Sequence, residues 1–236
     1  MAGIGELNEK PLHAALKAAC AEPGDRFEVP VDGYVIDIVR DDLLVEIQSR
    51  NFSAIKVKLK NLLHDHRLRL VYPIAGEKWI VKLPRENGDS ATRRKSPKKG
   101  RLEDLFWELI RIPHLMAHPN FSLEILLVQE EEVWRYEGQK KRNGRRHWRK
   151  KGWVTEERRL LEIVDRRLLA SPADAAAFLP DSLGETFTTK DIAEGLKIRR
   201  ALAQRMAYCL RHMQAVELIG KQSRANLYAR FEGDSA

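Results

Sequence analysis

Two carboxylates and one amide stand in neighbouring apolar segments of the chain. Asp37 lies within 34–40, YVIDIVR, and Glu46 and Gln48 lie in the segment that follows the acidic pair at 41–42. Short Val, Ile, Leu and Tyr runs separated by such turn residues predict a hairpin of two strands. Because side chains alternate across a strand, Asp37 projects from one face of the first strand, and Glu46 and Gln48 project from one face of the second. If these two faces coincide, two carboxylates and an amide oxygen converge.

Carboxylates placed among Val, Ile and Leu side chains indicate a particular chemistry. Their burial costs free energy unless a positive charge compensates it, and a metal ion is the usual solution. Hard oxygen ligands favour Mg²⁺ or Mn²⁺. The alternative is a hairpin with a solvated polar face and no metal.

The elements that must position these side chains follow from apolar spacing. Helical periodicity predicts a helix over 5–19, and 26–31 predicts a strand before the hairpin. Ser53 is expected to cap a helix that continues to His64. The nearly continuous apolar run 68–74 predicts a buried strand. The expected order is therefore helix, three strands, helix, strand.

This order, together with Asp37, Glu46 and Gln48, resembles the PD-(D/E)xK, or restriction-endonuclease-like, nuclease superfamily over about residues 5–83. The resemblance implies that Asp37 and Glu46 bind Mg²⁺ or Mn²⁺. Gln48 stands where this superfamily usually has Lys, although some members with a Glu-x-Gln element cut DNA. A carboxylate on the first helix assists in some members, which makes Glu6 a further catalytic candidate. Lys56, on the following helix, is expected to supply the missing ammonium group if its side chain points back to the site.

Strongly basic segments follow this region. The stretch 84–100 is rich in Arg, Lys, Ser, Gly and Pro and is expected to be a loop, serving as a basic flap or as a solubilising linker. A helix is expected over 102–112 and a strand over 123–128. Asn143-Gly144 then predicts a hairpin turn that sets Trp134 opposite Trp153. Like charges crowded at its tip suit a polyanion, so we expect DNA contacts from Lys140, Lys141, Arg142, Arg145, Arg146, Trp148 and Arg149.

The C-terminal third of the chain predicts a run of helices and two strands. A helix is expected over 155–169, with Leu160, Leu161, Val164 and Leu168 as its buried stripe. Thr188-x-x-Asp191 predicts a capping box, and strands are expected over 216–219 and 226–231. A longer helix is expected over 199–215, with an apolar side formed by Leu202, Met206, Cys209, Leu210 and Met213. The segment 172–232 thus resembles a winged helix-turn-helix domain. That resemblance implies duplex contacts from Arg200, Gln204, Arg205, Tyr208, Arg211, Lys221 and Arg224.

Composition sets the broad class of the protein. The 236 residues carry a net charge of +8, which suits a polyanionic partner. Only Cys20 and Cys209 are present, without a CxxC motif, and no apolar run is long enough to cross a bilayer. We therefore expect a soluble, cytoplasmic protein that binds nucleic acid. Double-stranded DNA is the expected partner, and an RNA-binding or RNA-cleaving protein is a third possibility, because basic charge does not distinguish the two polymers. A homodimer would suit cleavage of both strands of a duplex.

These expectations combine into one organisation. We expect a mixed α/β and α+β fold, consisting of a restriction-endonuclease-like αβββαβ core and a small winged-helix domain. The expected parts are a nuclease-like core over 1–84, a basic loop over 85–100, a core extension with the basic hairpin over 101–170, and a winged helix over 171–236. The leading hypothesis is a metal-dependent DNA endonuclease acting in restriction, repair or defence. The alternative is a DNA-binding regulator that retains a nuclease-like scaffold without cutting.

Overall fold

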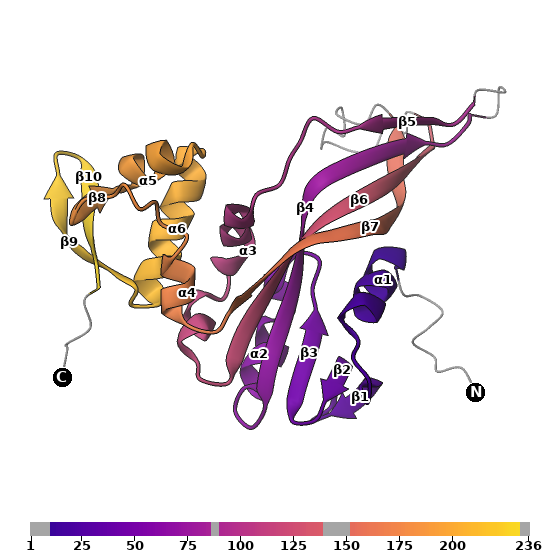
Figure 1. Cartoon of the computed structure of the whole chain (residues 1–236), viewed down its shortest axis with the longest axis horizontal. Helices are drawn as coiled ribbons and strands as arrows, with labels where there is room; N and C mark the ends of the chain where they lie inside the picture. Colours follow the sequence, from indigo (N-terminus) through magenta and orange to yellow (C-terminus); the bar gives the residue numbers. More distant parts are fainter. Residues whose placement is uncertain (1–9, 86–89, 139–151, 232–236) are drawn as a thin grey trace. The chain divides into compact units, whose positions relative to one another are not determined.

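The protein has a mixed α+β fold with one large mixed sheet and several helices, as seen in the computed structural model (Figure 1). The structure describes residues 10–85, 90–138 and 152–231. The elements of the first half are α1 (Pro11–Cys20), β1 (Arg26–Val31), β2 (Tyr34–Arg40), β3 (Leu43–Ile47), η2 (Phe52–Ala54), α2 (Lys56–Leu62), β4 (Arg67–Lys82) and β5 (Thr92–Lys95). Those of the second half are η3 (Leu102–Leu105), α3 (Phe106–Leu109), η4 (Pro113–Ala117), β6 (Phe121–Tyr136), β7 (Trp153–Leu169), α4 (Pro172–Ala176), β8 (Thr186–Thr188), α5 (Thr189–Leu196), α6 (Arg200–His212), β9 (Val216–Gln222) and β10 (Ala225–Arg230).

The large sheet has the strand order β1-β2-β3-β4-β6-β7, and β5 pairs with β4. Strands β1, β2 and β3 form an antiparallel meander, whereas β3 and β4 are parallel. A parallel pair requires a crossover connection, and η2 and α2 supply it. The observed order α1, β1, β2, β3, α2, β4 agrees with the order expected from the sequence.

Contacts divide the chain into two compact units, and each unit is discontinuous in sequence. One comprises 1–23, 73–101 and 126–166, and the other comprises 24–72, 102–125 and 167–236. Strands β4, β6 and β7 therefore contribute residues to both units. The boundaries expected near residues 84, 100 and 170 divide the chain differently.

The unit that contains β1 to β3 buries an aliphatic core. Leu59 and Leu62 of α2 and Leu68 and Leu70 of β4 are fully buried. Farther along the chain, Phe106 of α3 meets Phe178 edge to face, with ring centroids 5.7 Å apart. Helix α3 also contacts α6, so the short helices of 102–117 pack against the C-terminal helices within this unit.

The C-terminal segment contains the expected pair of helices and a small sheet. Thr188 and Asp191 form the expected capping box at the start of α5. All five residues assigned to the apolar side of α6 are buried: Leu202, Met206, Cys209, Leu210 and Met213. The two expected strands are β9 and β10, and β8, which the sequence did not indicate, completes a sheet of order β8-β10-β9. Burial raises the pKa of the Cys209 thiol to about 12, so this cysteine is a core residue.

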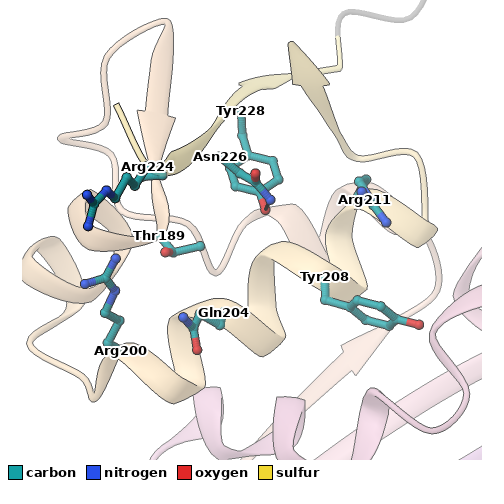
Figure 2. A pocket seen from close by; sticks show the side chains of 9 residues that line it. Thr189, Arg200, Gln204, Tyr208, Arg211, Arg224, Asn226 and Tyr228 are labelled. Carbon is teal, nitrogen blue, oxygen red and sulfur yellow. Dashed lines mark hydrogen bonds between the residues drawn. The ribbon is translucent and has the colours of Figure 1, made fainter. Parts of the chain in front are cut away.

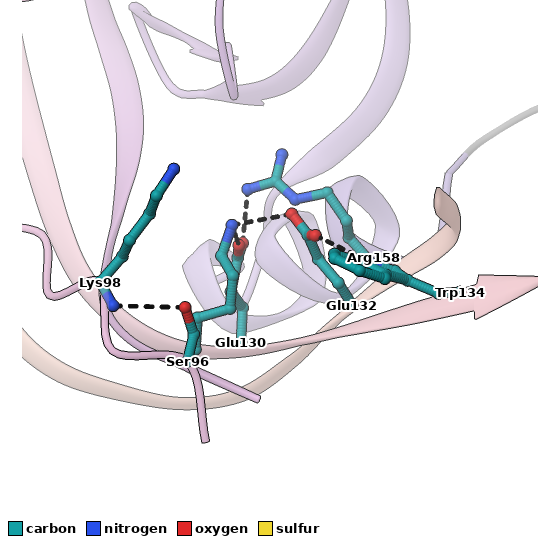
Figure 3. A network of polar contacts seen from close by, with 7 residues as sticks. Ser96, Lys98, Glu130, Glu132, Trp134 and Arg158 are labelled. Carbon is teal, nitrogen blue, oxygen red and sulfur yellow. Dashed lines mark hydrogen bonds and ion pairs between the residues drawn. The ribbon is translucent and has the colours of Figure 1, made fainter. Parts of the chain in front are cut away.

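The other unit contains a polar network between its strands (Figure 3). Glu130 is fully buried on β6 and is paired with Arg158 of β7 and, at 2.6 Å, with Nζ of Lys78 on β4. Lys78 also lies 2.8 Å from Glu132, whose second oxygen accepts a hydrogen bond from the Trp134 indole. These opposite charges compensate one another across three strands, which makes their burial tolerable.

The helix expected over 155–169 was wrong, because this segment is strand β7. The apolar residues assigned to a buried helical stripe do not form one: Leu161, Val164 and Leu168 are exposed. The pairing of β7 with β6 in the large sheet explains the difference. Pairing between strands thus overrides a local helical spacing.

Three smaller expectations were also wrong. Ile55, not Ser53, precedes α2, and no side chain caps that helix. The helix expected over 102–112 is split into η3 and α3, which are only four residues each. The stretch 84–100 is not entirely a loop, because β5 pairs with the end of β4. Within the described ranges, no helix is both long and apolar enough to cross a membrane.

Candidate functional site

The hairpin of β2 and β3 brings Asp37 and Glu46 together. Its register pairs Ile38 with Val45 and Val39 with Leu44, and continuing it by one step sets Asp37 opposite Glu46. Directly opposed residues project from the same face of a sheet, so the two carboxylates are neighbours. Asp37 Oδ2 accepts a hydrogen bond of 2.8 Å from the backbone N–H of Ile47, which holds this carboxylate against β3.

Lys58, not Lys56, brings an ammonium group to the carboxylates. Its Nζ lies 2.5 Å from Oε1 of Glu46 and donates a hydrogen bond of 2.6 Å to the carbonyl oxygen of Val35. Lys56 is exposed. Residues two apart on a helix lie about 200° apart around its axis, so only one of these lysines faces the sheet. The expectation that α2 supplies the ammonium is met by a different residue from the one named.

The environment of Glu46 shifts its protonation equilibrium. The residue is 6% exposed. Burial and the negative charge of Asp37 raise the pKa of Glu46 to about 7, although Lys58 acts in the opposite direction. The site therefore carries less negative charge near neutral pH than two ordinary carboxylates would, and a further cation would favour the ionised pair.

Gln48 has a different surrounding from the two carboxylates. Its Nε2 donates hydrogen bonds to the backbone oxygens of Arg50, at 2.6 Å, and Asn51, at 3.2 Å. Asn51 adopts a left-handed conformation with φ of 61°, so the amide group of Gln48 stabilises the turn that leads into η2. The next residue, Phe52, donates its backbone N–H to Glu108 of α3 at 3.0 Å. Sequence reasoning did not identify this role of Glu108, because the two residues are 56 positions apart.

The donor set suits a divalent cation of the Mg²⁺ type. Within the described residues, no three His, Cys, Asp or Glu side chains are grouped so that they would hold a metal ion unaided. Mg²⁺, however, is usually held by one or two carboxylates, with water and substrate phosphate oxygens as its other ligands. Asp37 and Glu46 meet that requirement. The implied assisting residue Glu6 lies outside the described residues.

A second candidate site is a hollow between α6 and the β9-β10 strands (Figure 2). It has a volume of about 350 Å³. Five residues named from the winged-helix resemblance line it: Arg200, Gln204, Tyr208, Arg211 and Arg224. Thr189, Asn226 and Tyr228 add polar groups to the same wall. The sequence therefore identified most of the side chains that meet here.

The three arginines of this hollow are uncompensated. Across residues 10–85, 90–138 and 152–231, no carboxylate forms an ion pair with Arg200, Arg211 or Arg224, whereas Lys190 nearby pairs with Glu194. Figure 2 shows the Arg200 and Arg224 side chains extending toward the same side of the hollow. Guanidinium groups gathered in this way suit phosphate oxygens.

Two of the seven residues expected to contact the duplex, Arg205 and Lys221, do not line this hollow. The guanidinium of Arg205 stacks 4.1 Å from the ring centroid of Trp107, and its Nη1 donates to the carbonyl oxygen of Ala201. Lys221 lines a different hollow, beside the acidic side chains of Asp191 and Glu194. Arg205 thus joins α6 to α3, and neither residue belongs to the arginine group of the first hollow.

The tip of the basic hairpin lies outside the described residues, together with all seven of its expected DNA contacts: Lys140, Lys141, Arg142, Arg145, Arg146, Trp148 and Arg149. The base of the hairpin is described. There the ring of Trp153 packs on Tyr136, with centroids 5.4 Å apart, and Glu137 N–H donates to Gly152 oxygen. The expected Trp134 to Trp153 pair was therefore wrong, because the returning strand meets β6 two residues nearer the tip.

The fold and the first site define an α+β protein with paired carboxylates and a lysine on one face of a mixed sheet. Residues 10–170 match the family model described as "Domain of unknown function (DUF8091)", and the chain belongs to that family. An uncharacterized protein of Treponema pallidum (strain Nichols) is 31% identical over 203 residues, covering 84% of this chain and 78% of that protein. No solved structure matches the chain.

Proposed function

We propose that this protein is a metal-dependent nuclease that hydrolyses DNA phosphodiesters. The observation that carries the proposal is the grouping of Asp37, Glu46 and Lys58 on one face of β2, β3 and α2. Two carboxylates suit a divalent cation, and an ammonium beside them suits a phosphate that gains negative charge during reaction. The element order from α1 to β4 supports a restriction-endonuclease-like core.

Each residue has a defined task in this proposal. Asp37 and Glu46 hold Mg²⁺ or Mn²⁺, which when bound supplies Lewis acidity toward water and the phosphate. Lys58 compensates the charge of Glu46 while the site is free of substrate, and its ammonium provides a cation for the phosphate oxygens. The hydrogen bond from Ile47 N–H keeps Asp37 oriented toward β3.

The hollow with three uncompensated arginines supports nucleic acid as the substrate class. Arg200 and Arg211 come from α6, and Arg224 comes from the turn between β9 and β10. A recognition helix and a wing would therefore both contact the same duplex. Phosphate contacts from such groups position a protein on DNA without reading its sequence.

A DNA-binding regulator is the second candidate, and one observation favours it. Lys58 compensates part of the charge of Glu46 and is itself bound to the carbonyl oxygen of Val35, so the protein supplies its own cation to this carboxylate where a metal ion would otherwise serve. The Gln48 amide, in the position where the resembling nucleases have Lys, stabilises a turn instead. In that case the arginine hollow alone would carry function.

Cleavage of supercoiled plasmid DNA in the presence of Mg²⁺ or Mn²⁺ separates the two candidates. The wild-type protein should nick the plasmid, and Asp37→Asn and Glu46→Gln should each abolish nicking while DNA binding persists. Asp42→Asn is the matched control, because Asp42 is an exposed carboxylate of the same hairpin that pairs with Arg67. Binding without metal-dependent cleavage of duplex DNA, single-stranded DNA or RNA would reject the nuclease and support the regulator.

A further inference from the structure

Strand β7 ends the large sheet, and its middle part is exposed among the described residues. It is the last strand in the order of the large sheet, and among the described strands it pairs only with β6. Of the six residues from Leu161 to Arg166, every one except Ile163 is exposed. Leu161 is 44% and Val164 53% exposed. Aliphatic side chains on a terminal strand favour pairing of that strand with another one.

The other terminal strand of the sheet is protected from such pairing. Pro30 in β1 has no N–H to donate, and Glu28 has φ of 51° and drops out of the ladder with β2. Proline and local irregularities are common ways to block a sheet edge. Residues 153–166 of β7 contain neither proline nor glycine, and none has a positive φ. The chain thus blocks one edge and leaves the other able to pair.

The order of side chains along β7 selects a second copy of the same chain as the partner. Around Glu162, Leu161 and Ile163 lie one residue away on either side, and Arg159 and Asp165 lie three residues away. Two antiparallel copies with Glu162 at the two-fold axis would set Leu161 opposite Ile163 and Arg159 opposite Asp165. Aliphatic pairs and opposite charges across strands are stabilising. Arg159 already contacts Glu131 and Glu157 of its own chain, so Asp165 of the second copy would be an additional carboxylate beside it. A surface of this kind is complementary to itself, as a two-fold interface requires.

The remaining charges do not oppose this register strongly. Arg158 and Arg166 would face each other, but Arg158 is paired with Glu130 and Arg166 donates a hydrogen bond to the carbonyl oxygen of Ala19. The two Glu162 side chains would meet at the axis, and this like-charge contact weakens the pairing. The contact between the two Glu162 side chains also gives a specific test of the register, because removing their charge should lower the dissociation constant of the dimer.

We propose that two copies of this protein associate through antiparallel pairing of their β7 strands, which joins the two large sheets edge to edge. The partner is a second copy of the chain, with Leu161, Val164, Arg159 and Asp165 at the contact. The proposal does not depend on the nuclease activity, and its test measures mass rather than cleavage.

Sedimentation velocity of the full chain over a range of concentrations tests the proposal. The wild-type protein should reach the mass of a dimer. Val164→Lys should raise the dissociation constant at least about tenfold, because it buries a charge against an apolar neighbour. Val57→Lys is the matched control, since Val57 is 68% exposed on α2, and it should leave the dimer unchanged. Circular dichroism confirms that each variant is folded.

Charge exchange identifies the register. Arg159→Asp and Asp165→Arg should each weaken the dimer, the double variant should restore it, and Glu162→Gln should strengthen it. A wild-type protein that is monomeric at every concentration overturns the proposal. A dimer that resists Val164→Lys and both single charge reversals also overturns it, because that dimer must use another surface. A double variant that stays dissociated rejects the pairing of Arg159 with Asp165.

Discussion

The ammonium group of Lys58 lies 2.5 Å from Oε1 of Glu46 and also binds the carbonyl oxygen of Val35, so one side chain of α2 joins β3 to β2. This contact fixes the face of α2 that covers the candidate site. It also satisfies a buried carboxylate that would otherwise face Asp37 without compensation. Lys58 and Lys56 are therefore not equivalent in the proposed site.

Lys58→Met should lower the rate of DNA cleavage by about 10²-fold to 10³-fold, a loss comparable to removing one preorganised electrostatic contact to a reacting group. Lys56→Met, a change of the same kind two residues away, should cleave at the wild-type rate. Single-turnover cleavage with DNA in excess of its dissociation constant measures the chemical step apart from binding. Equal losses in both variants would mean that α2 contributes only general positive charge.

Glu46→Gln should change how stability depends on pH. The pKa of Glu46 is raised from 4.5 to about 7, so the folded protein binds more protons than the unfolded chain between these values. Stability from this group is therefore present below about pH 4.5 and decreases as the pH rises to about 7. The variant should lack this decrease. The difference in the free energy of unfolding between the variant and the wild type should therefore shift in favour of the variant by up to about 3 kcal/mol from pH 5 to pH 8. Urea unfolding at both pH values measures the difference.

The effect of divalent cations on thermal stability tests Glu46 in a second way. Protons and metal ions compete for Glu46, so Mn²⁺ or Mg²⁺ should raise the melting temperature more at pH 8 than at pH 5. At ten times its dissociation constant, a bound ion adds about 1.4 kcal/mol of stability. EDTA should reverse the shift, and Glu46→Gln should remove it. A shift that persists in the variant would place the cation elsewhere.

Replacing both Arg200 and Arg224 with Ala should weaken DNA binding and reduce its salt dependence. If each guanidinium neutralises one phosphate, the slope of log K against log salt should fall by about 2. Arg205→Ala is the informative control, because Arg205 stacks on Trp107. It should lower thermal stability and leave the slope unchanged. Fluorescence anisotropy of a labelled duplex at several salt concentrations gives these slopes.

Local patterns in the sequence were sufficient for the hairpin and the C-terminal helices. Asp37 and Glu46 were placed together because alternation along two strands and a short turn determine which side chains share a face. The capping box of Thr188 and Asp191 and the apolar side of α6 likewise depend on neighbours only a few residues apart. Each of these features is confirmed in the structure.

The misassigned elements depend on distant parts of the chain. The residues of β7 have helical spacing, and only pairing with β6 makes them a strand. Lys56 and Lys58 were indistinguishable in the sequence, because the start of α2 decides which of them faces β3. Arg205 was grouped with the other arginines of α6, since the position of Trp107 beside it follows from packing between α3 and α6.

The discontinuity of the two units limits how the protein can be dissected. A fragment ending near residue 84 lacks 102–125 and 167–236, which belong to the unit of Asp37 and Glu46. A fragment beginning near residue 171 lacks Phe106 and Trp107, on which Phe178 and Arg205 pack. Truncations at these positions would expose core surface on both pieces, so deletion mapping would report misfolding rather than the location of an activity. Point substitutions in the intact chain are the appropriate genetic tool.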